Sequence, residues 1–260
     1  MNILNPDYNW HHQFSIALAE HKIECHFFLE DDFKLVEVNT SLLINLVGLN
    51  NSFKPGDLIR LKEKYFKKNI RLIHLWEDVW LLKPAQVLGR IKSLLGQNIR
   101  IHGRKTKVFK ITKPVADAFL TKNHLQGPVS SRYKVGLFEK EDLVAVATFS
   151  ALRKMNHTEN YKSAELIRFA VKAGYSITGG LSKLIAYFAE TYKPNDLMTY
   201  ADCDWSAGEA YDTLGFVQTT FLSPQIYILD EHLNRQLKKE NQISAQEVFN
   251  TGSLKFILKF

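Results

Sequence analysis

The sequence predicts a protein of the mixed α/β class with two domains. Its 260 residues are close to the length at which one hydrophobic core gives way to two. Hydrophobic residues at 45% and aromatic residues at 12% supply enough apolar surface for filled cores. Patterns typical of strands and helices alternate along the chain without an internal repeat. We therefore expect domains at residues 1–100 and 101–260.

The net charge of +7 comes from one stretch of the chain. Residues 1–59 carry three Lys or Arg against eight Asp or Glu, residues 60–113 carry fifteen against three, and residues 114–260 carry sixteen of each. Concentrated cations attract a polyanion because binding releases its condensed counterions. DNA is therefore the expected partner, and a solvated lysine-rich helix surface is the alternative. The candidate nucleic-acid contacts are Lys62, Lys64, Lys67, Lys68, Arg104, Lys105 and Lys107.

Cysteine content and hydropathy indicate a cytoplasmic setting. The chain has two cysteines, Cys25 and Cys203, and their spacing does not suggest a zinc or redox site. Residues 1–13 lack the basic start and apolar run of a signal peptide, and no uninterrupted apolar stretch approaches ~18 residues. We expect a reducing compartment and no membrane partner. The oligomeric state stays open.

The front half reads as a strand hairpin followed by helices around one buried strand. Alternating apolar residues flank an acidic turn at 30–32, and an apolar run at 42–49 ends before the breaker at 54–56. Asp57 is a plausible N-cap for a basic helix reaching Lys68. A continuous apolar run at 70–76 indicates a buried strand, and a helix at 83–95 ends at Gly96. Residues 97–113 form the expected linker.

The back half alternates helices and strands. A helix at 114–122 is followed by a strand hairpin at 133–138 and 143–150, and by a strand at 164–171. A helix at 181–192, a strand at 197–201, a helix at 207–214 and a strand at 216–221 come next. The tail, residues 230–260, predicts a polar helix and a closing strand at 254–260.

Two glycines, Gly179 and Gly180, stand between a strand and the helix at 181–192. Such a turn presents backbone N–H groups at the positive end of a helix, which suits a pyrophosphate. A plain turn is the alternative. The candidate cofactor-binding residues are Thr178, Gly179, Gly180, Ser182 and Lys183.

A resemblance to the GNAT N-acyltransferases extends this interpretation. The segment Gly208–Phe216, with an alanine and a tyrosine before Leu-Gly-Phe, resembles the helix and strand that follow the coenzyme A loop in that family. The loop positions match Ile177, Gly180 and Ser182, so that Ile177 stands where the family has Arg or Gln. The resemblance implies a GNAT-like mixed sheet with flanking helices, and acetyl-CoA or another acyl donor.

The order of polar residues over about 115–225 also resembles the phage Mom-type DNA modification proteins, a divergent GNAT branch. That resemblance implies that His124, Arg168, Asp202 and Tyr211 line one pocket, with Ser182 at its loop, and that the substrate is adenine in DNA. Tyr211 would act as general acid, Asp202 or His124 would accept a proton, and Arg168 would hold a carboxylate or phosphate.

Structural roles are the alternative for each of these four residues. Tyr211 would then only pack its ring, His124 would cap the preceding helix, and Asp202 would cap the following one. An Arg168–Asp202 ion pair is a further structural possibility.

The front half resembles very-short-patch-repair-like endonucleases, especially phage homing endonucleases. The resemblance lies in residues 67–80, with Arg71, the series Leu-Ile-His and the acids Glu77 and Asp78. It implies a restriction-endonuclease-like α/β module. The positions matching the family's catalytic set keep the Glu and the Asn, Glu37 and Asn39, and replace the others, reading His26, Thr40, Leu43 and Ile44. Glu37 is the candidate ligand for Mg²⁺, whose oxygen ligands nuclease chemistry needs.

Three hypotheses follow. The first is a Mom-like enzyme that modifies a nucleobase or another amine with an acyl donor, while a nuclease-derived front half holds DNA. The second is a homing-type, Mg²⁺-dependent endonuclease whose back half recognises DNA. The third is a DNA-binding protein without catalytic activity.

Overall fold

The chain forms two compact units that are interleaved in sequence. The computed structural model describes residues 9–155, 158–240, 242 and 246–260. Unit 1 consists of residues 1–84, 202–206 and 223–253, and unit 2 of residues 85–201, 207–222 and 254–260. The division that we expected near residue 100 thus lies after Pro84, and two later segments return to unit 1. Among the described residues, no helix has the length and apolarity needed to cross a membrane.

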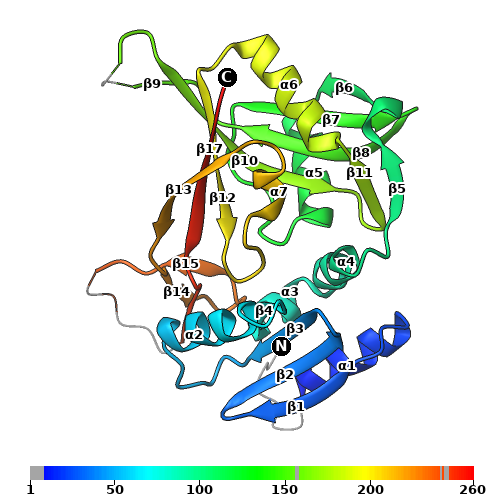
Figure 1. Cartoon of the computed structure of the whole chain (residues 1–260), viewed down its shortest axis with the longest axis vertical. Helices are drawn as coiled ribbons and strands as arrows, with labels where there is room; N and C mark the ends of the chain where they lie inside the picture. The colour runs from blue at the N-terminus through cyan, green and yellow to red at the C-terminus, as the bar shows by residue number, and fades with distance from the viewer. Residues whose placement is uncertain (1–8, 156–157, 241, 243–245) are drawn as a thin grey trace. The chain divides into compact units, whose positions relative to one another are not determined.

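Unit 1 is built on a four-stranded mixed sheet in the order β1-β2-β3-β4 (Figure 1). Strands β1, β2 and β3 pair antiparallel, while β3 and β4 pair parallel and are joined through α2. The bounds confirm the expected hairpin, basic helix and buried strand. The N-cap of the helix is Lys54 and not Asp57, which lies inside the first turn and accepts from the Lys54 N–H. They are α1 Trp10–Glu20, β1 His26–Glu30, β2 Phe33–Asn39, β3 Leu42–Val47, α2 Pro55–Phe66 and β4 Arg71–Trp76.

The burial pattern explains the order of these strands. All six residues of β3 are buried, as are five of the six residues of β4, which is typical of parallel strands covered on both faces. Helix α2 covers one face with Leu58, Leu61 and Tyr65, which are spaced for one side of a helix.

The later segments of unit 1 add a three-stranded antiparallel sheet in the order β15-β14-β16. Its strands are β14 Ile226–Leu229, β15 Arg235–Leu237 and β16 Glu247–Phe249, and the helix α3 Glu77–Leu82 follows β4 in the first segment of the unit. The Phe249 ring meets the Trp76 ring edge to face, with 4.9 Å between centroids. The polar helix predicted in this region was wrong for the described residues, because the chain there pairs with β14 instead.

Unit 2 contains a sheet in the order β13-β17-β12-β10-β8-β7-β6, with β9 paired to β10. Its main strands are β6 Lys107–Lys110, β7 Tyr133–Glu139, β8 Asp142–Phe149, β9 Arg153–Lys154, β10 Lys162–Val171, β12 Asp196–Asp202, β13 Val217–Leu222 and β17 Ser253–Lys259. Its helices are α4 Pro84–Leu94, α5 Lys113–Asn123, α6 Gly180–Tyr192 and α7 Glu209–Asp212.

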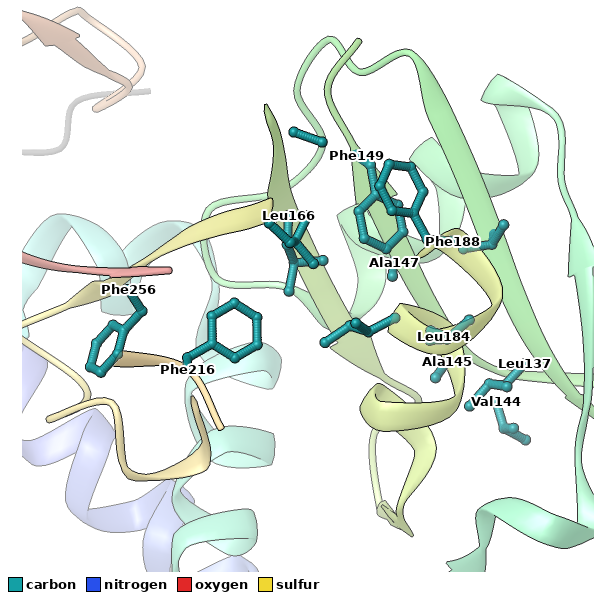
Figure 2. Close-up of a cluster of buried hydrophobic side chains, with 14 of the residues drawn as sticks. Leu137, Val144, Ala145, Ala147, Phe149, Leu166, Leu184, Phe188, Phe216 and Phe256 are labelled. Atoms are coloured by element: carbon teal, nitrogen blue, oxygen red, sulfur yellow. The ribbon is translucent and has the colours of Figure 1, made fainter. Parts of the chain in front are cut away.

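Helices cover both faces of this sheet. On one face, the ring of Phe188 from α6 stacks on Phe149 from β8, with 4.0 Å between centroids (Figure 2). On the other face, Ala116 and Leu120 of α5 pack against Val146. The predicted linker is folded into unit 2 as β5 Ile99–His102, the short 3-10 helix η1 Gly103–Lys105 and β6.

The two central strands of unit 2 part along their length. Strands β10 and β12 pair parallel only from Ser163–Glu165 to Asp196–Met198. Beyond that point β10 shifts its register against β8, between Leu166 and Arg168. A hydroxyl bridges the parting strands, because Thr199 Oγ1 donates to the Leu166 carbonyl at 3.0 Å. Main-chain and side-chain groups are thus presented between β10 and β12.

Helix α7 depends on one glycine. Gly208 precedes the helix with φ +85°, and a Cβ there would lie 2.2 Å from the Phe256 ring. Only glycine fits this backbone and this approach without strain. The glycine thus sets where Tyr211 of α7 stands.

Candidate functional site

The glycine turn lies at the start of α6, as the sequence predicts. Gly179 is left-handed at φ +73° and caps the helix, and Gly180 is its first residue. Ser182 is exposed in the first turn and Thr178 is exposed just before it. The first N–H groups of a helix have no partner within it. They carry partial positive charge at the end of a 13-residue helix, which favours an anion.

Lys183 does not face a ligand directly. Its Nζ donates to the carbonyl of Gly103 at 3.0 Å and to the carbonyl of Thr106. Thr106 Oγ1 donates to the same Gly103 carbonyl at 2.6 Å. The ammonium group therefore holds η1 against α6, a role that differs from the predicted contact with a cofactor.

The η1 segment, which carries two basic residues, lies against the glycine turn. Strand β5 runs parallel to β11, Tyr175–Thr178, with His102 opposite Thr178. A Cβ on Gly103 would lie 3.0 Å from the Thr178 carbonyl oxygen, so η1 touches the turn. Arg104 and Lys105 are exposed on η1. Because Lys183 is engaged with main-chain carbonyls, exposed cations for the turn at 179–180 come from a separate segment, η1.

Tyr211 stands next to the point where β10 and β12 part. Its hydroxyl lies 3.4 Å from Thr199 Oγ1, and its half-buried ring packs on Phe216 and Phe256 at 5.4 Å each. Burial raises the pKa of the phenol, against smaller lowering effects of the Thr199 hydrogen bond and of the charges on Arg90 and Arg168. The phenol is therefore protonated at neutral pH and is able to donate a proton.

Arg168 on β10 and His124 at the end of α5 both form hydrogen bonds with the loop that follows α5. Arg168 Nε donates to the Gly127 carbonyl at 3.2 Å, and its Nη1 donates to the Ile167 carbonyl at 2.9 Å. His124 is the C-cap of α5, and its Nδ1 accepts from the Gln126 N–H at 3.0 Å. The Gly127 N–H donates to the His124 carbonyl at 3.1 Å. These bonds fix both side chains through main-chain groups, and they match the capping role considered for His124.

Asp202 belongs to unit 1, whereas His124, Arg168, Ser182 and Tyr211 belong to unit 2. Its Oδ1 accepts from the Asp204 N–H at 3.0 Å. Its charge helps to raise the pKa of Asp204 and of Tyr227. Three of the four residues expected to line one pocket thus belong to unit 2, and Asp202 belongs to a segment of unit 1.

Two polar residues near the parting strands were missed by the sequence interpretation. Glu165 on β10 is paired with Met198 on β12, and Tyr200 follows two positions later on the same face. The pKa of Tyr200 is raised by burial and then by the Glu165 carboxylate, while Arg153 lowers it. Only the strand register shows that the carboxylate and the phenol are neighbours.

Unit 1 contains a group of buried charges that binds its distant segments together. Arg235 forms two bonds with the Asp78 carboxylate, at 2.6 and 2.9 Å. Asp204 Oδ1 accepts from the Thr251 N–H at 2.8 Å and from the Thr251 hydroxyl at 2.7 Å. Burial, followed by the charge on Asp202, raises the pKa of Asp204 to about 7. Asp78, suggested by the endonuclease resemblance, therefore has a structural partner.

Lys62 is also used inside unit 1. Its Nζ donates to the carbonyl of Cys203 and, at 3.3 Å, to the carbonyl of Ser206. This engagement removes Lys62 from the set expected to contact DNA. Lys64 pairs with Glu30 at 3.0 Å, whereas Lys67, Lys68 and Lys107 are exposed. Exposure leaves those three able to meet an anion.

The matched nuclease positions take part in local structure. Asn39 accepts from the N–H and the hydroxyl of Ser41, at 2.9 and 3.0 Å. Asn45 on β3 lies 3.1 Å from His74 Nδ1, and burial together with the Lys62 charge lowers the pKa of His74 to about 3. Glu37 is exposed on β2. Within the described residues no three His, Cys, Asp or Glu side chains are grouped to hold a metal, so Mg²⁺ chemistry has no support.

No family model and no curated protein matches the chain. Solved structures similar over about 60% of its length are GNAT-type acetyltransferases. One is a GNAT family acetyltransferase from Elizabethkingia anophelis with acetyl-CoA bound, at 13% identity, covering 60% of this chain and 99% of that one, with a TM-score of 0.35. Another is the ribosomal-protein-S18-alanine N-acetyltransferase from Escherichia coli, at 16% identity, covering 59% and 93%, with a TM-score of 0.39. A third is Arabidopsis thaliana Naa50 in complex with a bisubstrate analogue, at 13% identity, covering 60% and 99%, with a TM-score of 0.38.

Proposed function

We propose that unit 2 transfers an acyl group from a coenzyme A-type thioester to an amine. The observation that carries this proposal is the position of a protonated phenol beside the parting strands. Tyr211 reaches Thr199, and Thr199 bonds to the Leu166 carbonyl on β10. A proton donor therefore stands where β10 and β12 leave main-chain groups available to a substrate.

The start of α6 supports a site for the phosphates of the donor. The segment η1, which carries Arg104 and Lys105, is held against the start of α6 by Lys183, and in this proposal the two cations join the amides after Gly179 in binding the phosphates. This arrangement compensates for Ile177, which stands where the related family has Arg or Gln. Arg104 and Lys105, which the sequence suggested for DNA, are assigned here to the donor.

The chain's own groups account for the proton transfers. A bound acyl thioester supplies the electrophilic carbonyl. The amine forms the new C–N bond and loses a proton to the Glu165 carboxylate, a candidate that we prefer to Asp202 or His124. The C–S bond breaks, and the leaving thiolate takes the proton of Tyr211. The tyrosinate and the glutamic acid then return to their starting states by exchange with water.

We further propose that the acceptor is an amine of a nucleobase, as in the Mom-type proteins. The net charge of +7 of the whole chain supports a polyanionic partner such as a nucleic acid. Incubating the full chain with acetyl-CoA and an oligonucleotide, followed by mass spectrometry of the nucleosides, tests this acceptor. Acetylated nucleosides are expected, and consumption of acetyl-CoA by peptide amines alone would contradict the proposal.

Replacing Tyr211 by phenylalanine is expected to lower kcat about 100-fold, because a positioned general acid contributes ~10²–10⁴-fold. The ring contacts with Phe216 and Phe256 remain, so KM for the donor changes little. The rate of free thiol release measures the effect. Tyr187 on α6 is also half-buried, and the hydrogen bonds of the Thr199 hydroxyl go to Leu166 and Tyr211 and not to Tyr187. Tyr187→Phe therefore serves as the matched control. Equal rates for the two variants would exclude Tyr211 as the acid.

A further inference from the structure

A short two-stranded ribbon carries unbalanced positive charge in unit 2. The β9–β10 ribbon is formed by Arg153–Lys154 paired antiparallel with Lys162–Ser163 (Figure 1). Arg153, Lys154 and Lys162 are all exposed, and Glu159 is the one acid between Arg153 and Lys162 in the sequence. Among the residues that the structure describes, none of these three cations forms an ion pair. The ribbon therefore presents its charge to solvent.

Two of these cations face each other directly. Lys154 is the ladder partner of Lys162, and like charges placed opposite one another across a ladder destabilise it. The repulsion is relieved when an anion lies across both ammonium groups. A phosphodiester chain, with regularly repeated charges, provides such an anion at more than one position.

Register places one end of the ribbon beside the candidate acceptor site. Arg153 is paired with Ser163, and Ser163 lies two residues before Glu165 on β10. Glu165 is paired with Met198, which lies two residues before Tyr200 on β12. Because side chains alternate along a strand, Arg153, Glu165 and Tyr200 share one face, whereas the Lys154–Lys162 pair lies on the other face of the ribbon.

Tyr200 offers a planar surface on that face. The residue is 36% exposed, and its hydroxyl lies 4.0 Å from the Met198 sulfur. An exposed aromatic ring beside cations is the combination that binds unpaired nucleotides, since bases stack on the ring while phosphates meet the charges. An acidic peptide would use the cations but would gain little from the ring.

We propose that Tyr200 and the β9–β10 ribbon bind a single strand of nucleic acid. A base stacks on the Tyr200 ring with its exocyclic amine toward Glu165, and Arg153 on the same face holds the adjacent phosphate. The strand then passes over the outer edge of β9, which is paired with β10 at the margin of the sheet, and its next phosphates meet Lys154 and Lys162 on the other face. This inference rests on the proposed transferase function for the role of Glu165. It also assigns nucleic-acid binding to a surface other than the one suggested by Lys64, Lys67 and Lys68.

Binding of a fluorescently labelled single-stranded oligonucleotide to the full chain, measured by anisotropy without a donor, tests the proposal. Lys154→Ala with Lys162→Ala is expected to weaken binding and to reduce the slope of log affinity against log salt by ~1.4, about 0.7 for each phosphate contact on a single strand. Tyr200→Leu is expected to weaken binding about tenfold, while Tyr200→Phe keeps the affinity because the ring is retained.

Control variants and a competing peptide distinguish this binding surface from the alternatives. Exchanging Lys122 and Lys239, both exposed, for alanine changes the charge equally and is expected to leave the slope unchanged. The proposal is overturned if the Lys154→Ala and Lys162→Ala double variant binds the oligonucleotide with wild-type affinity. It is also overturned if affinity is lost with Lys67→Ala and Lys68→Ala instead. Equal competition by an acidic peptide of the same charge overturns it as well. Melting curves confirm that each variant folds.

The two proposals fail separately. Ribbon-dependent binding of the oligonucleotide without thioester consumption leaves this surface intact and removes the transferase. Thioester consumption with a peptide amine, together with wild-type affinity of the ribbon and Tyr200 variants for the oligonucleotide, removes the surface and leaves the transferase.

Discussion

Replacing Arg235 by alanine is expected to lower the free energy of unfolding of unit 1 by about 3–5 kcal/mol, the range for breaking a buried ion pair. The Asp78 side chain is 2% exposed and would lose both charged bonds, at 2.6 and 2.9 Å. The guanidinium also lies over the rings of Trp76 and Tyr227, 5.6 and 5.9 Å from their centroids. Its removal leaves a buried carboxylate without compensation.

Tryptophan fluorescence in a urea titration measures this loss in unit 1 alone. The four tryptophans of the chain, Trp10, Trp76, Trp80 and Trp205, all belong to that unit. Arg60→Ala is the matched control, because Arg60 pairs with Asp57 while 72% exposed and is expected to cost less than about 1 kcal/mol. Exchanging both Asp78 and Arg235 for apolar residues should restore much of the stability. Equal losses of stability in the Arg235 and Arg60 variants would contradict a stabilising role for the buried Asp78–Arg235 pair.

Asp204→Asn is expected to stabilise unit 1 increasingly as pH rises from about 4 to about 7. Burial raises the pKa of Asp204 from 3.8 to about 7. Over that interval the unfolded chain has released a proton that the folded chain retains. The stability contributed by the protonated acid is therefore lost with rising pH over that interval. Asparagine stays neutral and keeps an oxygen for Thr251, so its advantage over the wild type grows with pH up to about pH 7.

Urea titrations of wild type and variant at several pH values measure this difference. Asp32→Asn, at an exposed turn, is the control and is expected to follow the wild type at every pH. A constant difference between the Asp204 variant and wild type would show that Asp204 is ionised in the fold from low pH.

Two buried histidines make the stability of unit 1 depend on pH in the opposite direction to Asp204. The pKa of His74 is lowered to about 3 by burial and by Lys62, and that of His11 to about 4 by burial and by Lys34. Both contribute stability that is present above about pH 6.5 and is lost as pH falls. In the wild type Asp204 offsets part of this acid sensitivity. The Asp204 variant should therefore lose stability on acidification more steeply than the wild type.

The local structure follows from the sequence where one segment decides it. Apolar spacing locates α2, β4 and α6, and the pair Gly179–Gly180 marks the start of α6. The ordered motifs also bring His124, Arg168 and Tyr211 into one unit. The interleaving of the units was not predicted, because Asp78 and Arg235 are 157 positions apart and no local pattern connects them.

Long cationic side chains were the least predictable part of the site. Lys62 and Lys183 have the residue type expected for binding a phosphate, yet both donate to carbonyls of segments far away in sequence. Their flexible stems reach whichever acceptor the fold provides, and the sequence does not show that acceptor. Glu165 and Tyr200 were missed for a related reason, since their proximity depends on the register of β10 and β12.

The distance along the chain between Asp78 and its partner also has a consequence during synthesis. At roughly 5–20 residues per second, about 8–30 s pass on the ribosome between the translation of Asp78 and that of Arg235. Val248 and Phe249, which cover Trp76, arrive later still. The nascent front segment therefore waits with an apolar surface and a lone carboxylate uncovered until residues 235–249 have emerged.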